Sequence, residues 1–471
     1  MADQREICFV NETTPPDQSM TRAEARTAAS MAGIYALRML GLFMILPVFA
    51  LYSEHLEGAT PALAGLAIGI YGMTQAFLQI PFGLLSDRIG RKPVIVFGLL
   101  VFALGSVMAA SADTIWGVIA GRAMQGAGAI AAAVMALTAD LVREEHRVKA
   151  MAIIGMSIGA SFAVAMVLGP LLNSWIGVPG IFWLTAVLAL GGIAVILLIV
   201  PNPVVSRVRR DAEAVPEQFT SVLRNPQLLR LDAGIFSLHL ILTASFVVLP
   251  LALRDLAGLD ASRHWEVYLP VLLLSLPMAV PFIIQAEKHQ RMKQVFVVSV
   301  IVVALAELVL FRFHNQVLAI GIGLFIFYSA FNLLEALLPS LIAKMAPPDS
   351  KGTAMGFYSS AQFFGAFVGG TVGGWLHGRF GLSSVFLFCA VVALAWLVLA
   401  LGMEAPGYLN TRLLRIGALD PDAARQLARR ITAVPGVAEV VVIAEDEVAY
   451  LKVDPRLLDE DVLDAVVENR G

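Results

Sequence analysis

Charged residues and cysteines are scarce in this sequence. Asp, Glu, Lys and Arg make up 15% of its 471 residues, against about 25% in ordinary soluble proteins. Its two cysteines, Cys8 and Cys389, are too few for a disulfide framework or a multi-ligand metal site. The formal net charge of −3 gives no basic field for nucleic acid, and no phosphate-binding Gly-x4-Gly-Lys-Ser/Thr loop is present. These absences argue against an ordinary cytosolic enzyme, a metal-dependent site and a self-contained ATP-driven machine.

Apolar residues are abundant instead, at 58% of the chain, with a mean hydropathy of +0.79. A helix needs about 20 mostly apolar residues to cross a bilayer. Twelve stretches meet this condition, which predicts an all-α membrane protein with 12 transmembrane helices. They lie at 28–52, 62–86, 93–112, 114–141, 150–173, 179–200, 228–253, 264–286, 294–313, 317–343, 353–377 and 382–403.

Basic residues gather on one side of this arrangement. If the N-terminus is inside, the tail and loops of that side carry 19 of the 33 lysines and arginines, and the opposite loops carry four. Positively charged loops are retained on the cytoplasmic side of a membrane. We therefore expect both termini to be cytoplasmic, with residues 1–27 forming a disordered tail.

The spans divide into two halves of six, 28–200 and 228–403, joined by a basic linker at 201–227. The two halves resemble each other when the sequence is shifted by 200 residues, and this resemblance includes charged positions. Two such repeats are typical of transporters that bind substrate between their halves. The charged pairs are Asp87 with Glu287, Arg88 with Lys288, and Arg91 with Arg291.

The composition changes after residue 404, where the long apolar runs end. The order of expected elements in 409–471 is strand, helix, strand, strand, helix, which predicts a small α+β ferredoxin-like domain whose fourth strand is absent. The domain has no Cys, His or Met, so thiolate binding of copper or zinc is excluded. We expect a domain that docks on its own chain or on another protein.

The loop after the second span carries the most specific motif. Residues 83–93 read Gly-Leu-Leu-Ser-Asp-Arg-Ile-Gly-Arg-Lys-Pro, and the fourth span reads Gly-Arg-Ala-Met-Gln-Gly-Ala-Gly from Gly121. Both resemble signatures of the major facilitator superfamily, over about residues 28–403. Within it, the first span and the C-terminal domain resemble the YajR-type family of bacterial transporters, which implies a bacterial inner membrane.

The resemblance implies a conformational latch at this loop. A carboxylate at Asp87 would face the N-terminus of the eleventh helix, where exposed N–H groups favour negative charge. Glycines would let the second and eleventh helices approach closely. The residues implied are Gly83, Asp87, Arg88, Gly90, Arg91 and Asp140 for the latch, Glu287, Lys288 and Arg291 for its counterpart in the second half, and Gly365, Gly369 and Gly373 for packing.

In this family the first, fourth, seventh and tenth helices line the central cavity. A charge inside the bilayer is costly unless it is paired or hydrated, and each of these helices carries one ionisable group. They are Arg38, Arg122, His239 and Glu335, with Asn332 one turn from Glu335. We expect Glu335 to carry protons and Asn332 to share hydrogen bonds with it, while His239 is either a proton relay or a satisfied helix residue. The resemblance links Arg122 to proton coupling, with a structural clamp as the alternative. Arg38 either holds an anionic substrate, pairs with an acid or is a fixed counter-charge. We expect Glu307 and Arg312 to form a surface pair.

These features predict a secondary active transporter that works by alternating access and is not an enzyme. The resemblance implies proton-coupled export of small, drug-like molecules, with the proton gradient as energy source and no cofactor or metal. The fifth span keeps Gly169 but departs from the glycine pattern of drug antiporters. Two alternatives therefore stay open, uptake of a small anionic metabolite and a non-transporting membrane sensor with a regulatory C-terminal domain.

Overall fold

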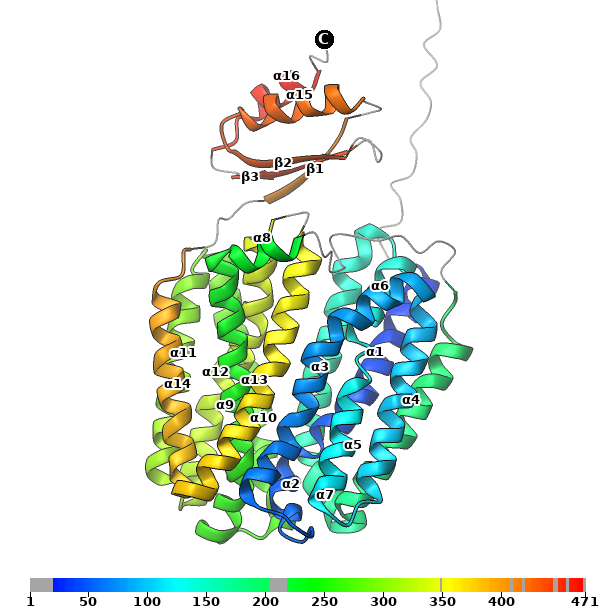
Figure 1. Ribbon diagram of the computed structural model, residues 1–471. Coiled ribbons are helices and arrows are strands. Elements are labelled where there is room, and N and C mark those ends of the chain that lie inside the picture. Colours follow the sequence, from blue (N-terminus) through cyan, green and yellow to red (C-terminus); the bar gives the residue numbers. More distant parts are fainter. Residues whose placement is uncertain are drawn as a thin grey trace, which may run out of the picture.

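Long helices run side by side through most of the chain, and a small α/β domain lies beyond one end of the bundle (Figure 1). The structure is a computed structural model that describes residues 20–202, 218–347, 350–405, 410–416, 420–443, 448–454 and 457–468. Most of the expected tail and linker, at 1–19 and 203–217, lies outside these residues. We call the end of the bundle beside the small domain the domain end, and the opposite end the far end.

The two halves of the bundle are built from helices in chain order. The first half contains α1 (Arg22–Phe43), α2 (Leu46–Ser53), α3 (Pro61–Ile89), α4 (Arg91–Ala110), α5 (Ile115–Ala127), α6 (Ala131–Leu141) and α7 (Glu144–Leu198). The second contains α8 (Phe219–Arg224), α9 (Pro226–Leu251), the π-helix η2 (Ala252–Leu256), the 3-10 helix η3 (Ala261–Arg263), α10 (Trp265–Lys288), α11 (Met292–Phe313), α12 (Val317–Met345), α13 (Lys351–Phe380) and α14 (Ser383–Leu401).

Ten helical segments of the described chain are long and apolar enough to cross a membrane. The expected fifth and sixth spans are continuous in α7 and separated only by Gly177, whose φ of 67° breaks the helix. The expected eleventh span, α13, is not among the ten, and it contains eight glycines. The twelve expected stretches are therefore all helical, and the all-α membrane fold is confirmed.

Two expected spans are broken helices. The first is divided between α1 and α2 at Met44 and Ile45, and the fourth between α5 and α6 at 128–130. A break leaves carbonyl groups without their helical partner. At the second break, the carbonyl oxygen of Gly128 accepts a hydrogen bond of 3.2 Å from Arg38 Nη2. The apolar pattern does not show these breaks, because the residues around them are as apolar as the rest of each span, although Pro47 and Gly128 stand beside them.

The N-terminal boundary also differs from the expectation. Helix α1 begins at Arg22 rather than at residue 28, because Thr21 and Glu24 form a capping box in which each side chain accepts from the other's backbone N–H. Glu24 additionally accepts three hydrogen bonds from Arg143 at the start of α7. Residues 22–27 of the expected disordered tail are therefore helical.

Backbones of the two halves touch at the far end, between α3 and α13. A Cβ atom placed on Gly370 would lie 2.6 Å from the carbonyl oxygen of Gly65, and one placed on Gly374 would lie 2.8 Å from the Gly65 Cα. Only glycine allows this approach. The expected packing glycines Gly365 and Gly369 are on the other side of α13, where a Cβ would collide with the backbone of α9. The expectation that they pack against the second span is therefore wrong.

An ion pair joins the two halves at the same far end. Arg254, in η2, donates to both carboxylate oxygens of Glu54, which follows α2, at 2.7 and 2.9 Å. The two residues are 200 positions apart, the shift that relates the two repeats. Residues at equivalent positions meet in this way when they lie close to the pseudo-twofold axis between the halves.

The C-terminal domain has the expected order of elements. Strands β1 (Asn410–Arg415), β2 (Val437–Ile443) and β3 (Val448–Val453) form an antiparallel sheet in the order β1-β3-β2. Helices α15 (Pro421–Thr432) and α16 (Glu460–Glu468) lie on the side of the sheet away from the bundle (Figure 1). The described residues of the domain therefore show the ferredoxin-like order of elements up to α16, with three strands in the sheet.

We predict that Gly65→Ala destabilises the protein by about 1–3 kcal/mol, because the added methyl group forces the backbones of α3 and α13 apart. The measurement is thermal unfolding of the purified protein in detergent. Gly155→Ala is the matched control, since a Cβ at Gly155 meets nothing within 4 Å. Equal melting temperatures for the two variants would contradict the prediction.

Candidate functional site

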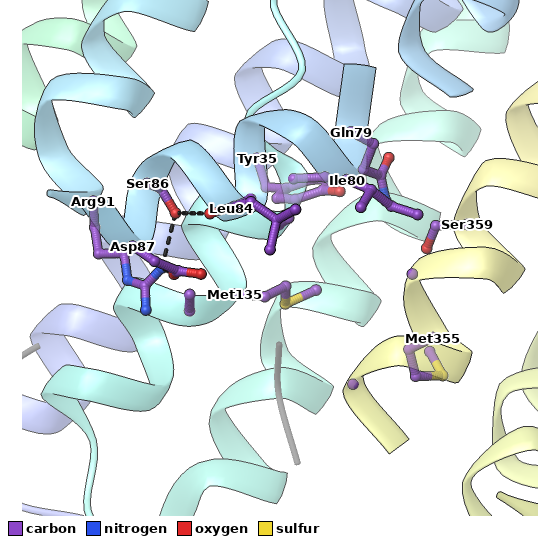
Figure 2. A pocket seen from close by; sticks show the side chains of 16 residues that line it. Tyr35, Gln79, Ile80, Leu84, Ser86, Asp87, Arg91, Met135, Met355 and Ser359 are labelled. Carbon is purple, nitrogen blue, oxygen red and sulfur yellow. Dashed lines mark hydrogen bonds and ion pairs between the residues drawn. The ribbon is translucent and has the colours of Figure 1, made fainter. Parts of the chain in front are cut away.

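A cavity lies between the two halves at the domain end (Figure 2). The first half contributes residues of α1, α3, α4 and α6 to its wall, and the second half contributes the first turns of α13. Figure 2 shows Met355 and Ser359 across the cavity from Asp87 and Arg91. The halves are therefore apart at the domain end and in backbone contact at the far end. The lining is Tyr35, Gln79, Ile80, Gly83, Leu84, Ser86, Asp87, Arg91, Ala131, Ala132, Met135, Ala136, Gly352, Met355, Gly356 and Ser359.

Arg91 is the centre of an ionic cluster on the wall of this cavity. Its guanidinium pairs with Asp87, donates to Ser86 Oγ at 2.8 Å, and lies 3.3 Å from Asp140 Oδ2. The side chains of Arg91 and Asp140 are 1% and 0% exposed. Gly90 makes the turn between α3 and α4 with a φ of 100°, and this turn brings Arg91 back towards Asp87. The pairing implied by the loop motif is therefore present.

The contact implied between Asp87 and the start of α13 is not made in this structure. The cavity separates Asp87 from Gly352 and Gly356. A Cβ atom placed on Gly83 would lie 3.1 Å from the Cβ atom of Ala132, so Gly83 faces its own half and not α13. Arg88 is exposed at the end of α3. The latch residues are thus assembled within the first half and are not engaged with the second.

A second polar network crosses the interior of the first half. Arg38 Nη2 donates to Gln75 Oε1 at 2.6 Å, and Gln75 Nε2 donates to Gln79 Oε1 at 3.1 Å. Because Gln79 lines the cavity, this chain connects Arg38 to the cavity. Arg122 donates to the carbonyl of Ala67 at 3.3 Å and to Gln125 at 3.0 Å.

The two arginines of this network share one aromatic ring. The Cζ atoms of Arg38 and Arg122 lie 5.7 and 5.3 Å from the ring centroid of Tyr71, and both residues are 1% exposed. Cation–π contact stabilises a desolvated guanidinium. Nε and Nη1 of Arg38 are buried and have no hydrogen-bond partner among the described residues. The alternative that Arg38 pairs with an acid is therefore not realised in the described part of the chain.

The second half places its ionisable groups in a separate cluster. His239 Nε2 lies 3.5 Å from Glu335 Oε1 and accepts a hydrogen bond of 2.8 Å from Gln362 Nε2. The side chains of His239 and Glu335 are 15% and 32% exposed. Asn332, expected to share hydrogen bonds with Glu335, donates instead to Ser275 Oγ on α10 at 3.2 Å. The four expected cavity groups thus form two clusters, one in each half.

The loop counterpart in the second half is arranged differently from the first. Glu287 pairs with Lys344 of α12 at 3.1 Å and accepts from Ser340 at 3.2 Å. Lys288 ends α10 and Arg291 precedes α11, and both are exposed. The motif is therefore arranged differently in the second half, where no buried arginine of the described residues links two acids.

Three expected packing glycines face α9, and a fourth faces the break in the first span. A Cβ on Gly373 would lie 3.1 Å from the Cα of Ala244, and one on Gly169 would lie 2.6 Å from the carbonyl of Met44. Gly169 thus allows α7 to approach the junction of α1 and α2. Its role is close packing within the first half. The glycines facing α9 are Gly365, Gly369 and Gly373.

The expected surface pair of Glu307 and Arg312 is wrong. Glu307 is 0% exposed, and Ser245 Oγ lies 3.2 Å from its Oε1. Ser245 is also 3.7 Å from the sulfur of Cys389. Arg312 lies over the ring of Phe313 instead. Glu307 therefore connects α9, α11 and α14 inside the second half. Its position along the span could be predicted from the sequence, but not that α11 is packed on two sides and buries this residue.

Comparison with known proteins agrees with this architecture. The profile of the Major Facilitator Superfamily matches residues 31–292 and 271–415. The chain belongs to the Major Facilitator Superfamily. The profile of the YajR YAM domain matches residues 414–468, which confirms the resemblance of the C-terminal domain to that of YajR-type members.

Relatives within the superfamily are transport proteins. The chain is 49% identical to the inner membrane transport protein YajR of Escherichia coli K12, over 94% of this chain and 97% of that protein. It is 27% identical to multidrug resistance protein MdtH of Yersinia enterocolitica, over 72% and 84%. A crystal structure of a bacterial homologue of the human lysosomal transporter Spinster, inward-facing and occupied, has a TM-score of 0.68 at 13% identity and covers 81% of this chain and 97% of that chain. The chain is therefore a multi-pass inner membrane transporter and not an enzyme.

Several residues that take part in these clusters were not predicted from the sequence of this superfamily member. Ser86 and Gln125 complete the two polar networks of the first half. In the second half, Lys344 of α12 pairs with Glu287 in place of the basic residues of the loop that contains Glu287. The pair of Glu54 and Arg254 had a signal, because both residues occupy one position of the 200-residue repeat. The others are neutral residues or distant partners, which only the folded chain brings together.

We predict that Arg91→Met destabilises the protein by about 3–5 kcal/mol, because it removes the buried guanidinium that pairs with the Asp140 carboxylate. The double variant Arg91→Met/Asp140→Asn should recover part of this loss, since the buried negative charge is then removed as well. The measurement is thermal unfolding in detergent of both variants. A double variant less stable than the single one would contradict this explanation.

Proposed function

We propose that the protein is a proton-coupled exporter of small, drug-like molecules that works by alternating access. The structure corresponds to the state that is open towards the cytoplasm, with the domain end on the cytoplasmic side. The observation that carries this proposal is the contrast between the two ends of the interface. A cavity separates the halves at the domain end, whereas glycine backbones and the Glu54–Arg254 pair join them at the far end.

The orientation rests on charge. Arg88, Arg91 and Lys92 flank the turn between α3 and α4, which lies at the same end as the C-terminal domain. Basic loops are retained on the cytoplasmic side. Both termini are then cytoplasmic, with the bilayer around the bundle.

Proton coupling rests on the pair of Glu335 and His239. Their facing atoms, Oε1 and Nε2, are 3.5 Å apart, and no cation of the described chain forms an ion pair with Glu335. A carboxyl group that a membrane protein buries without a cation is stable when it is protonated. Binding or release of a proton on Glu335 changes the charge beside His239 in the interior of the second half.

The direction and the substrate class rest on relatives. One of them is named a multidrug resistance protein, and the cavity lining combines Ile80, Leu84, Met135 and Met355 with a few polar groups. Apolar walls with few polar groups suit small amphipathic molecules. The partners are thus the small-molecule substrate, protons and the lipid bilayer.

We predict that Glu335→Gln abolishes substrate-dependent proton movement, because glutamine does not bind or release a proton. The measurement is dye recovery in inside-out vesicles with a preformed proton gradient, on adding lipophilic cations, antibiotics or small organic anions. Glu307→Gln is the matched control, since Glu307 is another acid inside the second half but accepts from Ser245 rather than facing a histidine. Recovery in the Glu335→Gln vesicles would remove Glu335 as the proton carrier.

The latch belongs to the opposite state of the cycle. When the halves close at the domain end, Asp87 can meet the N-terminus of α13, where the helix dipole favours its negative charge by about 0.3–2 kcal/mol. In the open state described here, Asp87 returns to Arg91. The same carboxylate therefore has a partner in both states, and the switch between partners accompanies closure.

We predict that Asp87→Asn shifts the protein towards the open state and slows transport, because asparagine lacks the charge that the helix terminus stabilises. The measurement is thiol labelling of a Met135→Cys reporter on the cavity wall, which should become about threefold faster. Glu287→Gln, the repeat-equivalent position, should leave labelling unchanged because Glu287 is paired with Lys344. An unchanged labelling rate in Asp87→Asn would contradict the proposed latch.

One observation favours a second function, uptake of a small anionic metabolite. Arg38 and Arg122 are both buried, neither forms an ion pair within the described chain, and Arg38 keeps three N–H groups without partners. The chain from Arg38 through Gln75 to Gln79 connects this positive region to the cavity. Saturable uptake of an organic anion, lost in Arg38→Gln, would support this function over export.

A further inference from the structure

The start of α13 is held by a short helix of its own half. Thr353, in the first turn of α13, donates a hydrogen bond of 3.1 Å to Gln218, which precedes α8. Phe219, the first residue of α8, packs edge-on against Phe357 with ring centroids 5.2 Å apart. Thr353 is 0% exposed. The described part of the linker thus contacts the start of α13, the helix whose N-terminus Asp87 would face when the latch is engaged.

The C-terminal domain contacts the chain just before the same helix. Lys452 of β3 donates a hydrogen bond of 3.1 Å to the carbonyl oxygen of Ala346, which is the C-cap of α12. The carbonyl end of a helix carries partial negative charge and favours a cation. Glu439 of β2 lies 3.3 Å from the same ammonium group and helps to position it. Lys452 therefore caps α12 from another domain.

Lys452 lies on the face of the sheet that the domain's own helices leave uncovered. Its neighbours along the strand, Leu451 and Val453, are in the core beneath α15 and α16, and alternate residues of a strand point to opposite faces. Figure 1 shows the sheet side of the domain turned towards the bundle. Although lysine is seldom buried without a partner, Lys452 is only 8% exposed, because it lies within the contact.

We propose that the uncovered face of the C-terminal sheet is a docking surface for the end of α12 in the same chain, with Lys452 as its anchor, and that this docking favours the state open at the domain end. The inference rests on the proposed alternating-access function and adds a regulatory contact to it. The occupant of the surface is the C-cap carbonyl of α12 at Ala346.

The position of the contact explains how the domain reaches the latch. Ala346 is five residues before Lys351, where α13 begins, so a contact at Ala346 restrains the segment that leads into the latch-receiving helix. The contact coexists with Asp87 turned away from α13. A contact made more strongly in one of two states shifts the population towards that state.

The test measures the two states directly in the full-length protein. Spin labels are attached at Leu84→Cys and Met355→Cys, which lie on the two walls of the cavity, in a Cys8→Ser/Cys389→Ala background in lipid nanodiscs. Pulsed electron resonance then gives the distance distribution across the domain end without any substrate. Release of the domain is followed in parallel by the rate of proteolysis of the chain between α14 and β1.

We predict that Lys452→Met raises the ratio of the short-distance to the long-distance population at least about threefold and accelerates proteolysis. Arg425→Met is the matched control, because Arg425 is a 73% exposed cation of the same domain that pairs only locally with Asp422, and it should change neither readout. Glu439→Gln should shift the populations in the same direction by less, since the ammonium keeps its carbonyl partner.

Two results would overturn the proposal. Faster proteolysis of Lys452→Met with an unchanged distance distribution would show that the domain docks without influencing the states. Unchanged proteolysis would show that Lys452 is not the anchor. Failure of the proposed function is seen separately, because a protein that does not alternate gives one distance population whether or not Lys452 is present.

Discussion

A charged or polar group inside a bilayer has no water to solvate it and must find its partners within the protein. This constraint determines how the transporter is built. In the first half, Arg91 draws Asp87 and Asp140 together, and Arg38 takes a carbonyl that a helix break has freed. In the second half, Glu335 lies beside His239. Each half thus satisfies most of its polar groups internally and can move as a unit.

The interface between the halves follows the opposite principle, since few polar groups cross it. At the far end its described contacts include glycine backbones, apolar residues such as Leu51 and Leu251, and the ion pair of Glu54 with Arg254, both partly exposed. An exposed pair contributes little to stability. Close packing without strong polar bonds can separate at modest cost, which is what a transporter that alternates between two states requires. At the domain end, the ionic cluster of Arg91 lies on one wall of the cavity.

The C-terminal domain adds a contact at the place where the halves open. Lys452 and the linker residue Gln218 both act on the chain around the start of α13, and none of the residues involved belongs to the superfamily's loop motif. A domain fused to a transporter can influence it in this way without touching substrate. In the proposed cycle, the latch and the domain act on one helix, Asp87 from the first half and Lys452 from the C-terminal domain.

The sequence by itself determined the membrane fold, the two halves and the order of elements in the C-terminal domain. Long apolar runs and strand-helix periodicity are properties of neighbouring residues, and the 200-residue repeat is found by aligning the sequence with itself. All three can therefore be read without a structure. The loop motif likewise identified the Asp87–Arg91–Asp140 cluster. Only the tertiary structure decided that Gly370 and Gly374, not Gly365 and Gly369, face α3, that Glu307 is buried, and that Asn332 bonds Ser275. Which side of a helix meets which neighbour depends on rotations and crossing angles that packing of the whole bundle sets, and an all-apolar helix carries no polar face from which to read them.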